Sequence, residues 1–293
     1  MKLTRTYNDL RDFLTAAPHP LGLVPTMGYL HEGHLALVRR ARAACATVGV
    51  SIFVNPTQFG PQEDLARYPR NLDRDLHLLE SAEVDVVWAP EVAAVYPPGY
   101  QTYVNVEAVS QPLEGAIRPD HFRGVATVVA KLFNAFTPDF AFFGQKDAQQ
   151  VAVIRRMAQD LNFPVKIEVS PTVRERDGLA MSSRNSYLSA EERRASVVLY
   201  QALSAARDAY QNGERSGEAL RSALRAALAR EPLAQTEYVS VADPDSLQEL
   251  KSVESDALFS MAVRIGKTRL IDNFELQKGI WQTGEIRMVD DRP

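Results

Sequence analysis

Two histidines lie three residues apart, at His31 and His34, in the segment VPTMGYLHEGHLALVRRARAA (residues 24–44). A short apolar run precedes them, and an amphipathic pattern typical of a helix follows. Paired imidazoles can bind a metal ion, or they can donate hydrogen bonds to an anion such as a phosphate. The spacing and the neighbouring residues favour one of these two chemistries.

Metal binding fits the spacing poorly. A zinc-binding helix of the HExxH type needs two histidines at i and i+4, whereas His31 and His34 are at i and i+3, and Gly33 would loosen the helix. No ligand-like spacing surrounds the remaining histidines, which are His19, His77 and His121. Two surface histidines beside a helix start are a further interpretation that the spacing alone allows.

Phosphate binding fits the surroundings better. The apolar run ends at Pro25, a tight turn containing Gly28 follows, and the histidines then open the predicted helix. The N–H groups and the dipole of a helix N-terminus attract anions. Imidazoles placed there can donate to phosphate oxygens and take on charge as negative charge builds. Ligands of parallel sheets bind beyond the carboxyl ends of strands, where this turn would lie.

The first half of the chain alternates apolar, strand-like runs with amphipathic segments. Continuous apolar strands between helices are typical of a parallel sheet that is covered on both faces. We therefore expect an α/β fold with a Rossmann-like doubly wound domain. Its expected strands are 21–25, 48–56, 84–90, 138–144 and 165–171, and its expected helices are 34–45, 71–82 (with Asn71 as the N-cap), 124–136 and 147–161.

The pattern changes after about Asn185. Ser189 and Glu192 form a capping-box pattern at the start of a long helix that ends at Gly213, and Ser216 begins a second helix. Three strand-like runs follow at 236–244, 256–266 and 268–276. These elements predict a smaller C-terminal α+β domain, with domains at 1–178 and 179–293.

Composition excludes several classes of protein. The 293 residues carry a net charge of −4, so no global attraction to nucleic acid or anionic membrane is expected. A single cysteine, Cys45, cannot form an internal disulfide and indicates a reducing compartment. No apolar run is long enough to span a bilayer, and the first residues do not resemble a signal peptide. We expect a cytoplasmic protein.

The HEGH segment resembles the HxGH signature of the nucleotidyltransferase superfamily, in which this motif follows the first strand and cradles the phosphates of ATP. The flanks make the resemblance specific, because Val24 to Leu188 closely resembles the pantoate–β-alanine ligase (pantothenate synthetase) family in the family's own order. The segments that carry it are 24–41, 51–70, 114–134, 142–151 and 173–188. The resemblance implies ATP-dependent joining of pantoate to β-alanine through a pantoyl adenylate, with Mg²⁺ and a homodimer.

The resemblance also implies a set of nucleotide-binding residues in domain 1–178 and a smaller domain that closes over the site. His34 takes the position of a proton donor, and His31, Lys146 and Arg184 act with it on the phosphates. The ATP-binding set comprises Met27, Gly28, Tyr29, Leu30, His31, Glu32, Gly33, His34, Gly144, Gln145, Lys146, Asp147, Val173, Met181, Ser182, Ser183 and Arg184.

The residues themselves allow both this assignment and simpler ones. Lys146 supplies a mobile ammonium for phosphate, and the hydroxyls of Ser182 and Ser183 with Arg184 could clamp a triphosphate. The simpler interpretations are a solvated lysine beside a capped helix at 144–150 and an N-cap cluster at 179–185.

Neutral amides predict the site of the acid substrate. Asn55 and Gln58 follow an apolar strand, and such amides can bind hydroxyls and a carboxylate without adding charge. The resemblance places pantoate against Gln58 and Gln150, with Asn55 beside them, and β-alanine near Gln58. It makes Asp75 a candidate magnesium contact, while Asp73 is as well explained by a solvated helix face.

Of two further loops, the first is expected to be a lid and the second is given no firm role. The polar segment Gly60–Arg70 has the composition of a lid that could exclude water from a reactive adenylate. Arg118, His121 and Arg123 are expected in a loop near the site or a subunit contact.

Three rival functions stay open: a nucleotidyltransferase that stops after transfer, a non-catalytic nucleotide-binding module and a zinc hydrolase.

Overall fold

The computed structural model describes residues 1–61 and 63–286, which form two compact units. Unit 1 comprises residues 1–111, 115–144 and 149–170, and unit 2 comprises 112–114, 145–148 and the chain from 171 onward. The division after Ser170 precedes the predicted boundary at 178. The two short excursions, 112–114 and 145–148, were not predicted from the sequence.

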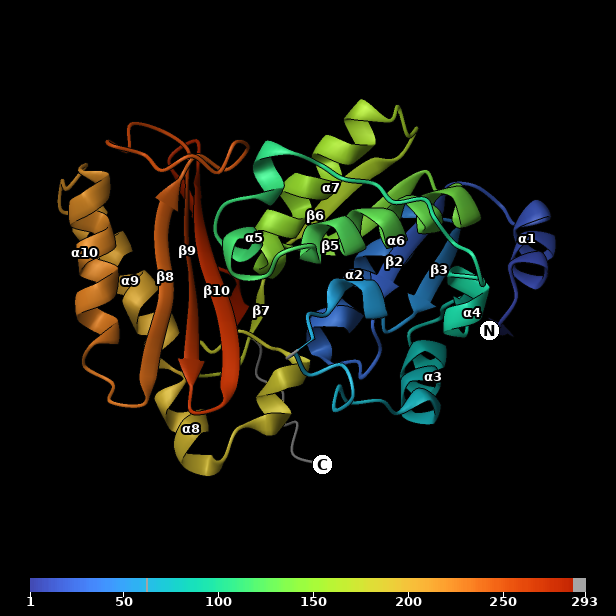
Figure 1. Cartoon of the computed structure of the whole chain (residues 1–293), viewed down its shortest axis with the longest axis horizontal. Helices are drawn as coiled ribbons and strands as arrows, with labels where there is room; N and C mark the ends of the chain where they lie inside the picture. Colours follow the sequence, from blue (N-terminus) through green and yellow to red (C-terminus); the bar gives the residue numbers. More distant parts are fainter. Residues whose placement is uncertain (62, 287–293) are drawn as a thin grey trace. The chain divides into compact units, whose positions relative to one another are not determined.

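A parallel sheet of six strands forms the centre of unit 1 (Figure 1). The strands lie in the order β1-β4-β3-β2-β5-β6, and the last five of these have the 3-2-1-4-5 order of a doubly wound sheet. The predicted Rossmann-like architecture is confirmed. The strands are β1 (Lys2–Thr4), β2 (Leu21–Thr26), β3 (Thr47–Ile52), β4 (Val86–Trp88), β5 (Phe140–Gly144) and β6 (Lys166–Ser170).

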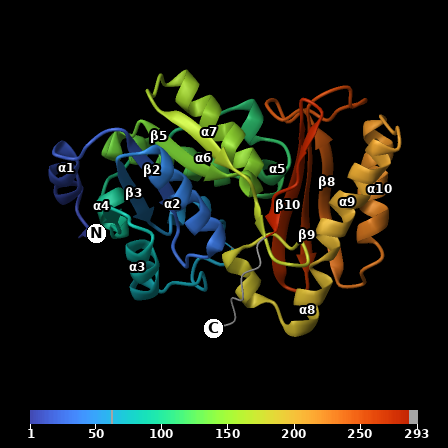
Figure 2. The same cartoon turned by 180° about the vertical axis from the view of Figure 1, so that it is seen from behind.

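Helices cover both faces of this sheet (Figures 1 and 2). Val48 and Val50 of β3 belong to a buried cluster with residues of α2 (Glu32–Ala44) and α3 (Leu72–Ser81). Gly49, between them, faces the opposite side, where a Cβ would lie 2.6 Å from the ring of Phe136 in α6 (His121–Phe136). The remaining helical segments of this part are α1 (Tyr7–Thr15), η1 (Pro56–Gln58), α4 (Val92–Val95), η2 (Ala108–Ser110), α5 (Glu114–Ile117) and α7 (Ala148–Asp160).

The strand order reverses at β2, which pairs with β3 on one side and with β5 on the other. In such sheets the two chains leave the switch point toward opposite faces, so a crevice opens beyond the carboxyl ends of the two central strands. Those ends are Thr26 of β2 and Gly144 of β5. The topology therefore places the turn before His31 at the binding edge of unit 1.

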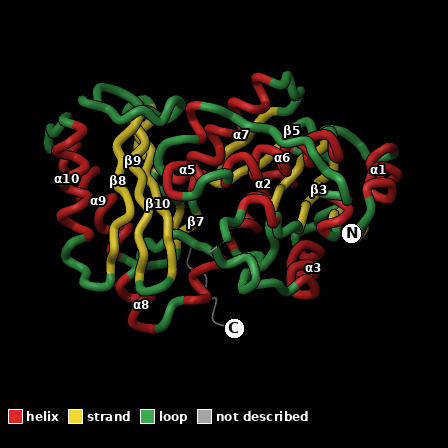
Figure 3. Tube along the Cα trace, viewed as in Figure 1, coloured by secondary structure: helices red, strands yellow, loops and turns green. Residues whose placement is uncertain are grey.

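Unit 2 is built on an antiparallel sheet of four strands with the order β11-β10-β9-β8. Figure 3 shows its three long strands, β10, β9 and β8, side by side. Its apolar core joins these strands to two long helices, so the predicted C-terminal α+β unit is confirmed. The elements are β7 (Val173–Arg174), η3 (Gln145–Asp147), η4 (Ser183–Tyr187), α8 (Ala190–Ala195), α9 (Val198–Gln211), α10 (Gly217–Leu228), β8 (Ala234–Ala242), β9 (Ala257–Ile265), β10 (Thr268–Gln277), β11 (Ile280–Gln282) and β12 (Glu285–Ile286).

The helix predicted from Ser189 to Gly213 is interrupted. The capping box of Ser189 and Glu192 forms as predicted, but α8 ends at Ala195 and α9 begins at Val198. The hydroxyl of buried Ser196 donates to the carbonyl of Glu192 at 2.7 Å. A serine that bonds back to the preceding turn bends a helix, which accounts for the break.

An ion pair in the interior of unit 2 holds distant strands together. Arg174 is 0% exposed and donates two parallel hydrogen bonds to the carboxylate of Asp272, at 2.7 and 2.8 Å. Its other N–H groups donate to backbone carbonyls of Gly178, Thr283 and Asn273. All five N–H donors of the guanidinium are therefore bound. The Asp272 carboxylate balances the buried charge, and the carbonyl oxygens replace the hydrogen bonds that water would supply.

No helix within residues 1–61 and 63–286 is long and apolar enough to cross a membrane.

We predict that Asp272→Asn lowers the free energy of unfolding by about 3 kcal/mol or more, because it leaves the Arg174 charge buried without its partner. Urea denaturation measures the loss. The control is Asp208→Asn, since Asp208 is 56% exposed in its pair with Arg207 and should change stability by less than about 0.5 kcal/mol. Equal effects of the two substitutions would contradict the compensating role of the buried pair.

Candidate functional site

His31 and His34 begin the helix α2 and cap it reciprocally. His31 is the N-cap residue, and its ring nitrogen Nδ1 accepts a hydrogen bond from the backbone N–H of Gly33 at 3.1 Å. The backbone N–H of His31 in turn donates to Nδ1 of His34 at 3.3 Å. The two rings lie 4.0 Å apart between centroids. The prediction that both histidines open a helix is confirmed.

This double cap fixes which ring nitrogen carries the proton. A backbone N–H can only donate, so Nδ1 of each histidine acts as an acceptor and carries no proton. In each neutral ring the proton is therefore on Nε2. Protonation of Nδ1 in either ring would remove its part of the cap, and protonation of both rings would place two cations 4.0 Å apart. The pair is thus arranged as two neutral Nε2–H donors at a helix N-terminus.

Glycines make this geometry sterically possible. A Cβ on Gly33 would lie 2.8 Å from the ring of His31, so the imidazole can fold over the helix start only because Gly33 has no side chain. Gly28 has φ of +79°, and Tyr29 follows with φ of 51°. Two successive left-handed residues turn the chain sharply between β2 and α2 and direct neighbouring N–H groups to one point.

Asp75 of α3 fixes this turn by hydrogen bonds to its backbone. Its carboxylate is 1% exposed and accepts hydrogen bonds from the backbone N–H groups of Tyr29 at 2.7 Å and Leu30 at 2.8 Å. Burial raises the pKa of the Asp75 carboxyl, although the bonds from Leu30 and Tyr29 and the charge of Arg74 lower it. The carboxylate is an anchor for the loop that carries the histidines.

This geometry does not fit the expected magnesium contact. Both oxygens of Asp75 are engaged with backbone N–H groups and are shielded from solvent, whereas Mg²⁺ needs accessible oxygens and usually keeps several waters. Asp73 is exposed on the same helix. Within the described part of the chain, no group of three or more His, Cys, Asp or Glu side chains could hold a metal ion.

The amides of Asn55 and Gln58 lie together in unit 1. They are 1% and 9% exposed, and Asn55 Nδ2 donates to Gln58 Oε1 at 3.1 Å. Gln58 Nε2 lies 3.1 Å from Met27 Sδ, in the turn before the histidines. A Cβ on Gly124 would lie 2.4 Å from the carbonyl oxygen of Thr57, so α6 approaches η1 closely only because of this glycine.

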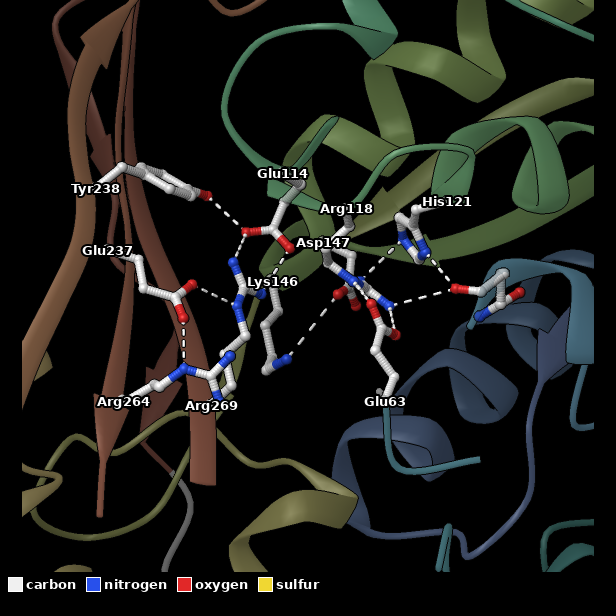
Figure 4. A network of polar contacts seen from close by, with 11 residues as sticks. Glu63, Glu114, Arg118, His121, Lys146, Asp147, Glu237, Tyr238, Arg264 and Arg269 are labelled. Atoms are coloured by element: carbon white, nitrogen blue, oxygen red, sulfur yellow. Dashed lines mark hydrogen bonds and ion pairs between the residues drawn. The ribbon is translucent and has the colours of Figure 1, made fainter. Parts of the chain in front are cut away.

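A second set of contacts holds the backbone of Gln58 and the start of the expected lid. His121 Nδ1 donates to the carbonyl oxygen of Gln58 at 2.8 Å, and its Nε2 lies 3.2 Å from Arg118 Nη1 (Figure 4). Arg118 also donates two hydrogen bonds to the Glu63 carboxylate, at 2.8 and 2.6 Å. These contacts give Arg118 and His121 a supporting role beside Gln58. Gln62 of the expected lid lies outside the described residues.

Arg123 and Gln150 take no part in the contacts described above for Gln58. The guanidinium of Arg123 lies 3.9 Å from the ring centroid of Tyr103 in a cation–π contact. Gln150 is half-buried near the start of α7, and its neighbour Gln149 is buried and donates to the carbonyl oxygen of Val109.

The expected ATP-binding residues that follow the strand β5 belong to unit 2, whereas Gly144 at the end of β5 belongs to unit 1. Gln145, Lys146 and Asp147 form the short helix η3, directly after Gly144. Asn273 Nδ2 donates to the backbone carbonyls of Gln145 at 3.0 Å and Lys146 at 2.9 Å. The backbone at Lys146 is therefore fixed, while its Nζ lies 3.9 Å from Asp147 and is held only weakly (Figure 4).

The 112–114 excursion is anchored to the sheet of unit 2. Glu114 is 6% exposed and accepts two hydrogen bonds from Arg269, both at 2.7 Å, and one from Tyr238 Oη at 3.0 Å (Figure 4). Arg269 also donates to Glu237 at 2.7 Å. No pattern in the sequence indicated this network.

The second predicted phosphate segment of unit 2 follows β7 and includes the start of η4. The N–H of Met181 donates to the carbonyl oxygen of Val173, which brings these two residues together. Ser182 is the N-cap of η4 and accepts from the N–H of Arg184 at 3.3 Å, so the N-cap interpretation of this segment is confirmed. Ser183 is buried, and Arg184 is half-buried.

Comparison with known proteins gives one consistent result. Residues 2–275 match the family model described as pantoate-beta-alanine ligase. The chain is 62% identical to the pantothenate synthetase of Roseiflexus castenholzii over 277 residues, which is 94% of this chain and all of that protein. It is 59% identical to the pantothenate synthetase of Chloroflexus aurantiacus over 278 residues, which is 94% of this chain and 99% of that protein.

Solved structures agree with the sequences. A crystal structure of the pantothenate synthetase from Thermus thermophilus matches with a TM-score of 0.91 at 49% identity, covering 94% of this chain and 100% of that chain. The pantoate-beta-alanine ligase from Francisella tularensis, complexed with beta-gamma ATP and beta-alanine, matches with a TM-score of 0.77 at 32% identity, covering 94% of this chain and 97% of that chain.

We predict that Asp75→Asn lowers the free energy of unfolding by about 1–3 kcal/mol, because the amide NH₂ cannot accept from one of the two backbone N–H groups. Asp73→Asn, in the same turn of α3, is the control and should change stability by less than about 0.5 kcal/mol. Chemical denaturation of both variants measures the difference.

The raised pKa of Asp75 gives this prediction a pH dependence. The folded state holds the proton more tightly than the unfolded state, so the contribution of Asp75 to stability falls as pH rises from the ordinary value to the raised one. The stability advantage of the wild type over Asp75→Asn should therefore grow as pH falls through that window. A constant advantage across the acid range would show that burial does not raise this pKa.

Proposed function

The chain belongs to the pantoate–β-alanine ligase family, and from this premise we propose that it condenses pantoate with β-alanine in two steps at the expense of ATP. In the first step the pantoate carboxylate attacks the α-phosphorus of ATP, forming pantoyl adenylate and releasing diphosphate. In the second step the β-alanine amine attacks the acyl carbon, forming the amide of pantothenate and releasing AMP. This reaction belongs to pantothenate biosynthesis.

The observation that carries this proposal is the reciprocal cap of His31 and His34 at the carboxyl end of β2. It makes Nε2 of both rings a neutral N–H donor at a helix N-terminus, which suits the oxygens of a triphosphate. Transfer of a full proton from His34 would first need protonation at Nδ1 and loss of the cap. We therefore propose that both histidines stabilise charge on the departing diphosphate by hydrogen bonding.

Four further residues complete the proposed nucleotide site. β5 is the hydrogen-bonded neighbour of β2, and both strands are parallel, so residues that follow them start from the same edge of the sheet. Lys146 lies two residues beyond β5. We propose that its ammonium binds the phosphates together with Ser182, Ser183 and the guanidinium of Arg184. The other members of the ATP-binding set are proposed to line the nucleotide, with Val173 and Met181 in contact through backbone atoms or packing.

Neutral amides form the proposed pantoate site. Asn55 and Gln58 bring no charge into a buried place, so they can hold a hydroxy acid without trapping its carboxylate as an ion pair. Gln150 is proposed to contact the same substrate, and β-alanine is proposed to bind near Gln58. The segment Gly60–Arg70 is proposed to limit access of water to the adenylate.

Magnesium is proposed to arrive on the phosphates of ATP, where it neutralises charge, because Asp75 is engaged elsewhere. We further propose that the enzyme acts in the cytoplasm as a homodimer.

The direct test of the function is exchange of labelled diphosphate into ATP, measured with a panel of hydroxy acids and without amine. We expect exchange that depends on pantoate. Release of AMP that depends on β-alanine then separates a ligase from a nucleotidyltransferase that stops after the first step. Exchange without any acid, or AMP release that ignores β-alanine, would contradict the proposal.

We predict that His34→Ala reduces the pantoate-dependent exchange rate by about 100-fold or more, because a donor to the transition-state charge is lost. The unfolding free energy should fall by only about 1 kcal/mol, the usual loss for one cap. The control is His77→Ala on the exposed face of α3, which should leave exchange unchanged. Exchange at the wild-type rate in His34→Ala would refute the assignment.

We predict that Gln58→Ala raises the KM for pantoate by about tenfold, the effect of one lost hydrogen bond, and leaves the KM for ATP nearly unchanged. Gln101→Ala, at an exposed position, is the matched control. Steady-state kinetics with each substrate varied in turn give both constants. Equal losses for ATP and pantoate would count against a specific pantoate contact.

A further inference from the structure

The orientation of the Asn55 side-chain amide is set by the backbone around it. Its Nδ2 lies 3.1 Å from the carbonyl oxygen of Gly124, which can only accept, and its Oδ1 lies 3.3 Å from the N–H of Thr57, which can only donate. Exchanging the two ends of the amide would place like groups against each other at both contacts. Asn55 therefore has one allowed orientation.

That orientation determines what Gln58 can offer to a ligand. Asn55 Nδ2 also donates to Oε1 of Gln58 at 3.1 Å, so the acceptor end of the Gln58 amide is used inside the protein. Its donor end, Nε2, is directed toward Met27 Sδ at 3.1 Å, a weak acceptor that a stronger one can replace. Gln58 thus presents N–H donors, which match carboxylate or hydroxyl oxygens.

Tyr96, at the end of α4, hydrogen-bonds to Asn55 and so begins a chain of contacts, Tyr96–Asn55–Gln58, that we call the relay. Its Oη donates to Oδ1 of Asn55 at 2.9 Å and lies 3.2 Å from the hydroxyl of Thr57. Burial raises the pKa of Tyr96 to about 12, so the hydroxyl keeps its proton at neutral pH. Phe53 and Tyr100 lie beside its ring, with centroids 6.2 and 5.0 Å away.

We propose that Tyr96 is a positioning residue for pantoate: its hydroxyl holds Asn55 so that the amide of Gln58 is presented with its N–H donors toward the substrate. The inference rests on the proposed assignment of Gln58 to the pantoate site. It adds a residue that does not touch the substrate but holds Asn55 in the orientation that the backbone allows, and through Asn55 the amide of Gln58.

Tyr96→Phe tests the proposal, because it removes the hydroxyl and keeps the ring. We expect the KM for pantoate to rise about fivefold, the effect of losing one neutral hydrogen bond, with kcat and the KM for ATP within about twofold of the wild type. Tyr100→Phe is the matched control, since its hydroxyl lies outside the relay, and it should change none of these constants. An unchanged pantoate KM in Tyr96→Phe would overturn the proposal.

A double-mutant cycle with Gln58→Ala separates this route from others. If Tyr96 acts through Gln58, Tyr96→Phe raises the pantoate KM in the wild type and has no further effect in the Gln58→Ala background. Equal effects in both backgrounds would overturn the relay while leaving the pantoate site intact. An unchanged pantoate KM in Gln58→Ala itself would instead contradict the proposed site, and the inference with it.

Thr57→Val provides a second variant, in case Tyr96→Phe does not fold. It removes the other hydroxyl donor to Asn55 Oδ1, at 2.9 Å. It should raise the pantoate KM in the same direction and should likewise have no effect in the Gln58→Ala background. An unchanged pantoate KM in Thr57→Val, or an equal rise in the wild type and in the Gln58→Ala background, would overturn the relay.

Discussion

The reciprocal hydrogen bonds at the start of α2 are the constraint on which the proposed chemistry depends. A helix N-terminus has backbone N–H groups without partners inside the helix, and here two imidazoles satisfy two of them. Each ring uses its Nδ1 to accept from the backbone, so Nε2 is the nitrogen that can donate. The same contacts that stabilise the helix therefore fix the tautomer of the groups that are proposed to meet the phosphates.

The pantoate side of the site follows the same physical rule. Asn55 uses both ends of its amide on the protein, Nδ2 on the carbonyl of Gly124 and Oδ1 on the N–H of Thr57, and it also occupies the acceptor end of the Gln58 amide. The donor end of Gln58 is therefore the end that is proposed to face the substrate. Asp75 orients the turn before the histidines in the same way, because its two oxygens accept hydrogen bonds from the N–H groups of that turn. The proposed binding groups are thus oriented by the protein before any ligand arrives, which reduces the entropy lost on binding.

Local patterns in the sequence predicted much of the fold. The apolar runs that became β2 to β6, and the caps at Asn71, Ser189 and Ser216, depend on residues within one turn or one strand. The strand β1 was missed because KLT has three residues and only one of them is buried. The break between α8 and α9 was missed because a serine within a helical pattern does not reveal whether its hydroxyl bonds backward.

The sequence indicated which residue types belong to the candidate site, but it did not indicate which hydrogen bonds they make. The resemblance made Asp75 a candidate magnesium contact, and the sequence does not show the partners of its carboxylate, which are backbone N–H groups 45 and 46 positions away. Tyr96 was not singled out, since a tyrosine before two prolines carries no signal of the amide it binds 41 positions earlier. Long-range hydrogen bonds to backbone atoms leave no trace in composition or periodicity.

The most direct measurement of the central claim is the nitrogen-15 NMR signal of the imidazole nitrogens of His31 and His34 at neutral pH, without and with ATP. The double cap predicts an unprotonated Nδ1 and a protonated Nε2 in both rings, with the Nε2 signals shifting when ATP binds. A proton on Nδ1 of either ring, or Nε2 signals that ignore ATP, would contradict it.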